Sequence, residues 1–483
     1  MSLSKIIDTK AKEIKIQNQF SRGLIILFFR QILAQGMIFL GNIFLSRQLT
    51  PNDYGLFSVL LNLYTTLAIF GDFGTNYAII QKEDEPSKSE LKSLFTIQTI
   101  FFSSIGIAVI LLSSHITAIL NADPKAGNII KFIGILSVTL PFKNIPFSLL
   151  ERNLRFREIA TIEVVNTFLH QSLLVFLIWK GFGVESLIWS LVARSFGDTI
   201  ATLLVYPWKP GISLDIRSTF SYLKFGISMQ WIKILAYIKD YLPTLIIASI
   251  MGMASAGSWV WAMSYISIPI YFNRMVDRIV YPAYARLQHD REGIGSVATK
   301  ALRINFIAGL FILLILILFS SEIVPNLYGE TWLGSTTLAI ILSINVIGGF
   351  VTSAIFPLFY ATGHTDVGTK SFFIWTILTG IMSLIGIYLY GLYGMGAGYS
   401  TATILISLFL LKKSRHITRI NLIISVFYPG LAAILSIALY TAISLLTELW
   451  FPKLLLLIII YVSLNKMVDI VFRGGIPLCR ASN

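Results

Sequence analysis

The side chains that could do chemistry in this chain are charged residues inside long apolar segments. On insertion scales a Lys, Arg or Asp near the centre of a membrane span costs about 2.5–3.5 kcal/mol, so it usually faces a bundle interior or a water-filled cavity. The central charges comprise seven cations and four anions, namely Arg30, Lys143, Arg194, Lys233, Lys239, Arg274 and Arg278 against Asp72, Asp198, Asp240 and Asp277. This leaves three cations without an internal partner. Because surplus buried positive charge is stable only beside water or an anionic ligand, the pattern predicts a cavity that receives an anion, and guanidinium forks suit a diphosphate.

Helical spacing brings several of these charges onto shared faces. Arg194 and Asp198 are four residues apart and therefore stack on one face of a helix. Lys233 and Asp240 share a face of the next predicted helix, and Lys239 lies to one side of it. We predict that this second group lines the cavity. For Arg194 and Asp198 the alternative, a structural pair that pins two helices, stays open.

A further cluster lies in the stretch YFNRMVDRIVYP, residues 271–282. There Arg274 stacks over Asp277 and Arg278 at spacings of three and four residues. Long basic side chains near the end of a span can instead extend to the lipid headgroups. That alternative stays open for four of the cations: Arg30, Lys143, Arg274 and Arg278.

These patterns predict two sets of site residues. The predicted diphosphate-binding residues are Arg30, Arg194, Lys233, Lys239, Arg274 and Arg278. The predicted carriers of a coupled H⁺ or Na⁺ are Asp72, Asp198, Asp240 and Asp277, although the sequence does not establish that transport is coupled.

Composition indicates what must position these residues. Hydrophobic residues make up 55% of the 483 and charged residues 13%, about half the charge that soluble domains carry. Apolar runs of about 20 residues, enough to cross a bilayer as a helix, recur throughout. We predict an all-α integral membrane protein with fourteen spans near residues 23–45, 55–79, 93–119, 128–150, 158–180, 185–206, 225–250, 257–282, 301–321, 334–361, 369–391, 394–411, 421–446 and 453–472.

The loops predict the orientation of these spans. One side carries 25 Lys and Arg residues and the other only four, Arg47, Lys125, Lys180 and Lys453, which places both termini in the cytoplasm. The first 22 residues resemble an amphipathic helix on an anionic leaflet. The net charge of +14 therefore reflects topology rather than binding of nucleic acid.

A weak internal repeat divides the chain. Gly55 and Gly257 begin equivalent spans 202 residues apart, and Asp72 and Arg274 follow them at matched depth. The predicted domains are residues 1–22, an N-terminal lobe of six helices at 23–210, a linker with a second six-helix lobe at 211–418, and two further helices with a tail at 419–483. A parallel repeat of this kind places a binding site between its halves near mid-membrane.

Motifs for catalysis are missing from the sequence. It contains no P-loop, CxxC or HExxH pattern, and the longest external loop, residues 322–333, is short. We therefore predict a transporter that is not an enzyme and has no cofactor or metal.

Several stretches resemble a known family. LSRQLTPNDYGLFSVLLNLYTTLAIFGDFGTNYAIIQKED (45–84) is similar to the first hairpin of Wzx-like oligosaccharide flippases, the polysaccharide transporters of the multidrug/oligosaccharidyl-lipid/polysaccharide exporter superfamily. Further similar stretches are LLERNLRFREIATIE (149–163), IKDYLPTLIIASIMGMASAGSWVWAMSY (238–265), DRIVYPAYARLQHD (277–290) and VPNLYGETWLGS (324–335). The resemblance implies two lobes around a V-shaped central cavity. One departure is Trp259, where many members have Tyr, so the identity of the bound sugar is less transferable.

The resemblance also implies a function. The expected substrate is an undecaprenyl-diphosphate-linked oligosaccharide, a repeat unit of O-antigen, capsule or exopolysaccharide, which a functional monomer moves across the bacterial inner membrane by alternating access. One alternative is a flippase for a peptidoglycan lipid precursor. The other is a drug or cation antiporter of the same superfamily, which would need an acidic cavity that the excess of cations opposes.

Overall fold

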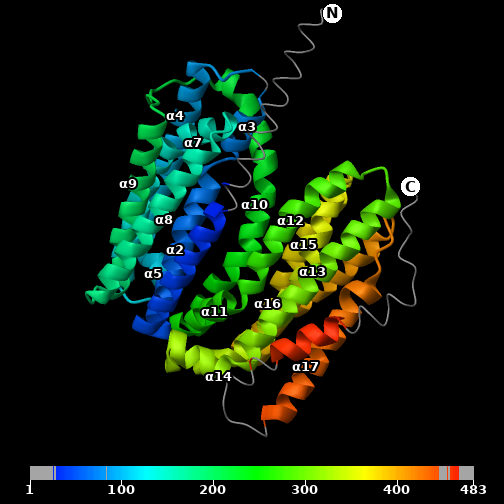
Figure 1. Cartoon of the computed structure of the whole chain (residues 1–483). Coiled ribbons are helices and arrows are strands. Elements are labelled where there is room, and N and C mark those ends of the chain that lie inside the picture. Colours follow the sequence, from blue (N-terminus) through cyan, green and yellow to red (C-terminus); the bar gives the residue numbers. More distant parts are fainter. Residues whose placement is uncertain (1–25, 27–28, 83, 445–453, 455–456, 467–483) are drawn as a thin grey trace, which may run out of the picture. The chain divides into compact units, whose positions relative to one another are not determined.

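The computed structural model describes residues 26, 29–82, 84–444, 454 and 457–466, and within them the chain is helical with no strand (Figure 1). Contacts divide the chain into two compact units, Met1–Gly257 and Ser258–Asn483. The predicted amphipathic segment 1–22, the tail and part of the last predicted span lie outside the described residues. The predicted lobe boundary at residues 210 and 211 stays a prediction, because units defined by contacts need not coincide with units defined by a repeat.

The first unit is a bundle in which the helices at Pro51–Gly71 and Lys88–Leu111 begin at polar capping residues. Thr50 accepts a hydrogen bond from the Asp53 amide at 3.2 Å, and Ser87 and Glu90 cap each other's backbone amides at the next helix. The elements are a helix at 29–48, α2 (Pro51–Gly71), α3 (Thr75–Gln81), α4 (Lys88–Leu111), α5 (Ser113–Ile119), α6 (Lys125–Ser137), α7 (Leu140–Arg152), α8 (Phe156–Trp179), η1 (Gly183–Glu185), α9 (Ser186–Val205) and α10 (Ile216–Met251), followed by the start of α11 (Met253–Ile266).

The span predicted as continuous at 55–79 is interrupted between α2 and α3. Phe73 and Gly74 have φ of 50° and 65°, in the left-handed region, so the helical hydrogen-bond ladder stops at Asp72. A Cβ on Gly74 would overlap the backbone of Gly226 in α10, so only glycine allows this close approach. The break leaves the Asp72 carboxylate at a helix end inside the unit.

The span predicted at 128–150 is also bent. Helices α6 and α7 meet at 47°, and α7 contains Pro141 and Pro146. Proline removes a backbone donor and crowds the preceding turn, which accounts for a bend in this region. Lys143 lies between the two prolines, beside the bend.

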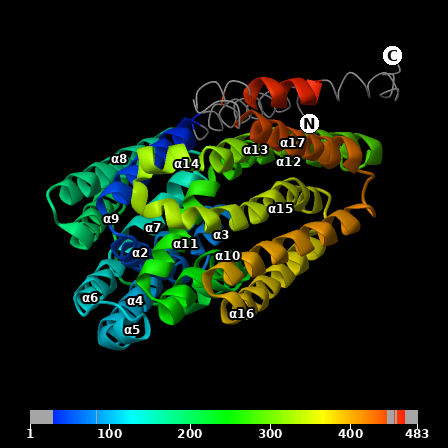
Figure 2. The same ribbon diagram turned by 90° about the horizontal axis from the view of Figure 1, so that it is seen from below.

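The second unit contains the remaining helices. The 50-residue element α16 has non-helical residues Tyr390 and Gly391, so it comprises two helices that correspond to the predicted spans 369–391 and 394–411. Figure 2 shows α17 beside α13, in agreement with their contacts. The elements are the rest of α11, α12 (Ile268–Arg286), α13 (Arg291–Leu318), α14 (Ser320–Ile323), η2 (Val324–Tyr328), η3 (Glu330–Ser335), α15 (Thr336–Ala361), α16 (Thr365–Ser414), η4 (Ile423–Phe427), α17 (Tyr428–Ser444) and a helix at 457–466.

Nine helices of the described residues are long and apolar enough to cross a membrane, or ten if α6 and α7 form one bent span. The predicted all-helical membrane architecture is confirmed, whereas the count of fourteen spans is not. Some of the remaining predicted spans correspond to helices that the structure breaks or shortens, such as α11 and α12 around Ser267. A span that is built from two short helices is not among the nine, because neither helix by itself is both long and apolar enough to cross a membrane.

Candidate functional site

Three ion pairs of the first unit lie at similar depth along their predicted spans. Arg30 pairs with Glu163, Lys143 with Asp198, and Lys233 with Asp72. In each pair both residues lie between five and eight residues from the same predicted end of their spans, which at about 1.5 Å per residue is roughly 10 Å. The pairs therefore form a layer of charge, which we call the ion-pair layer.

The pair of Lys233 and Asp72 is the loosest of the three. The Lys233 Nζ lies 3.9 Å from Asp72 Oδ2, beyond hydrogen-bond distance, and 4.4 Å from the centre of the Tyr77 ring. The lysine side chain is 40% exposed, whereas the aspartate side chain is 15% exposed and accepts a hydrogen bond from Thr75 Oγ1 at 3.2 Å. The ammonium group thus keeps donors that an additional anion could use.

The pair of Lys143 and Asp198 joins three helices. Lys143 Nζ of α7 donates to Asp198 Oδ2 of α9 at 2.6 Å, and Asn166 of α8 donates to the other carboxylate oxygen. The alternative that Asp198 has a structural role is thus supported, but its partner is Lys143 rather than Arg194. Both carboxylate oxygens are occupied, so this group contributes to helix packing.

Arg194 remains available one helical turn from Asp198. Its side chain is exposed, and no carboxylate of the described residues lies within ion-pair distance of it. A guanidinium group at this position can present its fork of donors to a planar or tetrahedral anion.

Lys239 is placed differently from Lys233. It is 8% exposed and pairs with its neighbour Asp240, whose side chain is half exposed. The face of α10 that bears Lys233 turns toward α2, since the Tyr237 hydroxyl donates to the Asn62 carbonyl at 2.7 Å. The structure therefore separates Lys239 from the side of α10 on which Lys233 lies.

In the second unit, α12 carries Arg274 and Asp277 three residues apart. Arg274 is exposed and lies 5.8 Å from the centre of the Tyr271 ring, with no ion-pair partner in the described part of the chain. Asn273 is 1% exposed, and neither its amide atoms nor Asp277 Oδ1 has a hydrogen-bond partner among the described residues. The Arg278 side chain lies outside the described residues.

Sequence reasoning missed Glu163, which was not counted among the central charges. Depth along the spans was the signal that could have found it, because Arg30 and Glu163 are seven and five residues from the same side of the membrane in the predicted spans 23–45 and 158–180. Lys143 and Asp198 also lie at similar depth, but Asp72 does too, so depth alone does not select the partner. Sequence spacing within one helix had suggested Arg194 instead.

Comparisons with known proteins extend over most of the chain. The lipopolysaccharide biosynthesis protein WzxC of Escherichia coli (strain K12) is 27% identical over 369 residues, which cover 74% of this chain and 72% of that protein. The probable low-salt glycan biosynthesis flippase Agl15 of Haloferax volcanii is 23% identical over 392 residues, or 79% and 80% of the two chains.

Solved structures share the fold. The lipid II flippase MurJ in an inward closed conformation matches with a TM-score of 0.75 at 15% identity, over 94% of this chain and 98% of that chain. An inward-facing multidrug resistance transporter of the MATE family, in the MOP superfamily, matches with a TM-score of 0.62 at 13% identity, over 82% and 97%.

A family model described as "Polysaccharide biosynthesis protein" matches residues 44–337, which is more than half of the chain. The chain belongs to this family of polysaccharide biosynthesis proteins.

Proposed function

We propose that this protein is a flippase that moves undecaprenyl-diphosphate-linked oligosaccharide units of a surface polysaccharide across the bacterial inner membrane. The name of Agl15, a probable glycan biosynthesis flippase, supports a transporter, and family membership and the name of WzxC support a role in polysaccharide biosynthesis. The observation that carries the proposal is that two cations of the first unit, Arg194 of α9 and Lys233 of α10, keep donors available for an anion.

In this proposal the diphosphate is bound by Arg194 and Lys233. A guanidinium group donates to two phosphate oxygens at once, while the ammonium group contributes a compact point charge. Lys239 and Arg30 are paired with the carboxylates of Asp240 and Glu163. They therefore adjust the net charge of the site, whereas Arg194 and Lys233 contact the diphosphate first. Arg274 and Arg278 of the second unit stay predicted contributors.

In this proposal, coupling of transport to H⁺ or Na⁺ acts on the same ion pairs. A proton or cation on Asp72 would weaken its attraction for Lys233 and so increase the affinity of that lysine for phosphate. Asp240 and Asp277 stay predicted carriers of a coupled ion, whereas Asp198 is already bound to Lys143 and Asn166. A carboxylate that titrates in this way links the ion gradient to substrate binding by mass action.

We propose further that the protein works as a monomer with both termini in the cytoplasm. The excess of Lys and Arg in one set of loops supports this orientation. In this arrangement the ion-pair layer lies in the cytoplasmic half of the membrane, where the substrate is loaded.

The decisive experiment is deletion of the gene followed by analysis of lipid-linked intermediates. The expected result is accumulation of complete lipid-linked oligosaccharide that an impermeant glycan-modifying enzyme cannot reach in intact spheroplasts, and reversal by the wild-type gene. Normal access of that enzyme in the deletion strain would overturn the proposal. Rescue of a strain that lacks its peptidoglycan-precursor flippase, without such accumulation, would indicate the alternative substrate.

A further inference from the structure

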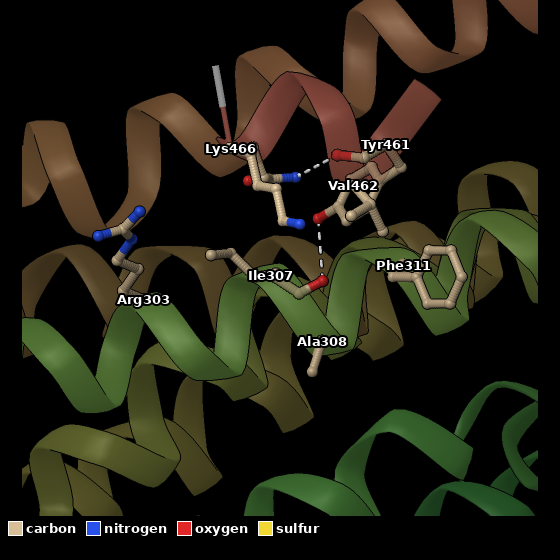
Figure 3. A pocket seen from close by; sticks show the side chains of 8 residues that line it. Arg303, Ile307, Ala308, Phe311, Tyr461, Val462 and Lys466 are labelled. Atoms are coloured by element: carbon tan, nitrogen blue, oxygen red, sulfur yellow. Dashed lines mark hydrogen bonds between the residues drawn. The ribbon is translucent and has the colours of Figure 1, made fainter. Parts of the chain in front are cut away.

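A pocket of the second unit combines an apolar lining with two basic side chains. It has a volume of about 240 Å³ and lies between α13 and the helix at 457–466. Figure 3 shows Arg303 and Lys466 toward one end and Phe311, with its partner Tyr461, toward the other. A charged end beside an apolar end is the chemical profile of a phospholipid headgroup and the start of its acyl chains.

The apolar end is held in shape by Tyr461. This side chain is 2% exposed, its hydroxyl donates to the Ile307 carbonyl at 2.9 Å, and its ring stacks on Phe311 with centroids 5.4 Å apart. The neighbouring Val462 is 43% exposed, so the pocket opens at the surface of the unit. A preformed slot that opens on an apolar helix surface can admit a chain from the surrounding bilayer.

The charged end lies at headgroup depth. Arg303 is 15 residues before Leu318, the end of α13, and so roughly 22 Å from it, which leaves the guanidinium within reach of one face of a hydrocarbon core about 30 Å thick. Lys466 is exposed and has no hydrogen bond or ion pair among the described residues. Basic pockets between spanning helices at this depth are suited to anionic lipid headgroups.

We infer that this pocket binds an anionic phospholipid of the bilayer, with the phosphate between Arg303 and Lys466 and an acyl chain along Phe311 and Val462. The pocket has room for part of a phospholipid, and its apolar lining of Ile307, Phe311 and Val462 suits an acyl chain. With the orientation proposed above, the lipid belongs to the cytoplasmic leaflet. None of the residues that line the pocket is among those proposed to bind the diphosphate.

Native mass spectrometry of the full-length protein tests this inference, with phosphatidylglycerol and phosphatidylethanolamine of identical acyl chains added in equal amounts. We expect preferential retention of phosphatidylglycerol. The double variant Arg303→Gln/Lys466→Gln should lose about 25-fold in affinity, at about fivefold per basic residue, whereas the matched variant Lys370→Gln/Lys412→Gln of the same unit should retain it. Val462→Trp, which fills the opening without removing charge, should lower retention too.

Equal retention of both lipids by the wild type, an unchanged double variant or an equal loss in the matched variant would overturn the inference. So would displacement of phosphatidylglycerol by added undecaprenyl diphosphate, which would assign the pocket to the transported lipid. The measurement contains no transport step, so its outcome is independent of the flippase proposal.

Discussion

Arg194 is the residue on which the proposed recognition of a diphosphate most depends. It is exposed in a spanning helix, one turn from an aspartate that is already bound to Lys143 and Asn166. Because Asp198 is engaged elsewhere, no carboxylate of the described residues lies within hydrogen-bond distance of the guanidinium group. Its cost of insertion is then offset by water or by an anion.

We predict that Arg194→Gln lowers the initial rate of transport of lipid-linked oligosaccharide into proteoliposomes by about 10- to 100-fold. Hydrogen bonds to charged groups contribute roughly 1.5–3 kcal/mol, which corresponds to such a factor. Arg194→Lys should recover part of the rate, since it restores charge without the fork. The control is Lys125→Gln, an exposed cation of the same unit, and equal rates for Arg194→Gln and this control would exclude a role for Arg194.

We predict a structural effect at the second pair. Asp198→Ala leaves Lys143 partly buried without its partner, and breaking such pairs costs about 3 kcal/mol or more. The double variant Lys143→Met/Asp198→Ala should therefore be more stable than Asp198→Ala alone. Thermal unfolding of the purified protein in detergent measures both, and a double variant less stable than either single variant would contradict the pairing.

At the scale of elements, the break between α2 and α3 positions the Asp72 carboxylate. The chain turns through left-handed conformations at Phe73 and Gly74 and then resumes as helix at Thr75. Backbone packing of Gly74 on Gly226 fixes the break against α10, the helix that carries Lys233. The loose ion pair between Lys233 and Asp72 is thus a product of two helices that approach at glycines.

We predict that Gly74→Ala greatly reduces the yield of monodisperse protein, because the methyl group would overlap the Gly226 backbone in addition to straining a left-handed residue. Gly181→Ala provides the matched control, since Gly181 has φ of 88° but no atom near its Cβ position. It should cost only the strain, roughly 1–2 kcal/mol. Size-exclusion chromatography and thermal unfolding compare the two, and equal behaviour would show that the close approach is unimportant.

At the scale of the whole molecule, the distribution of charge predicts the topology. The basic loops alternate with loops that hold only four cations, as insertion with basic loops in the cytoplasm requires. The single cysteine, Cys479, is near the C-terminus and so provides one chemical reporter of that end.

We predict that an impermeant maleimide labels Cys479 in inverted membrane vesicles and not in intact spheroplasts. In a Cys479→Ser background, Gly181→Cys should show the opposite pattern, because residue 181 follows a span that ends outside. Labelling of Cys479 from outside would reverse the proposed orientation. It would also move the ion-pair layer to the external half of the membrane.

The sequence by itself determined that this chain is a helical membrane protein with charges in its spans, because hydrophobicity and helical periodicity act locally. It also determined the approximate depth of each charge, and Lys143 and Asp198 lie seven and eight residues from the same side in their predicted spans. Only the tertiary structure decided which charges meet, since the partner across two helices depends on how each helix is rotated by its packing. The helix break at Asp72 depends on the close approach of Gly74 to Gly226, which belongs to a helix distant in the sequence. For the same reason, the local sequence pattern could not predict this break.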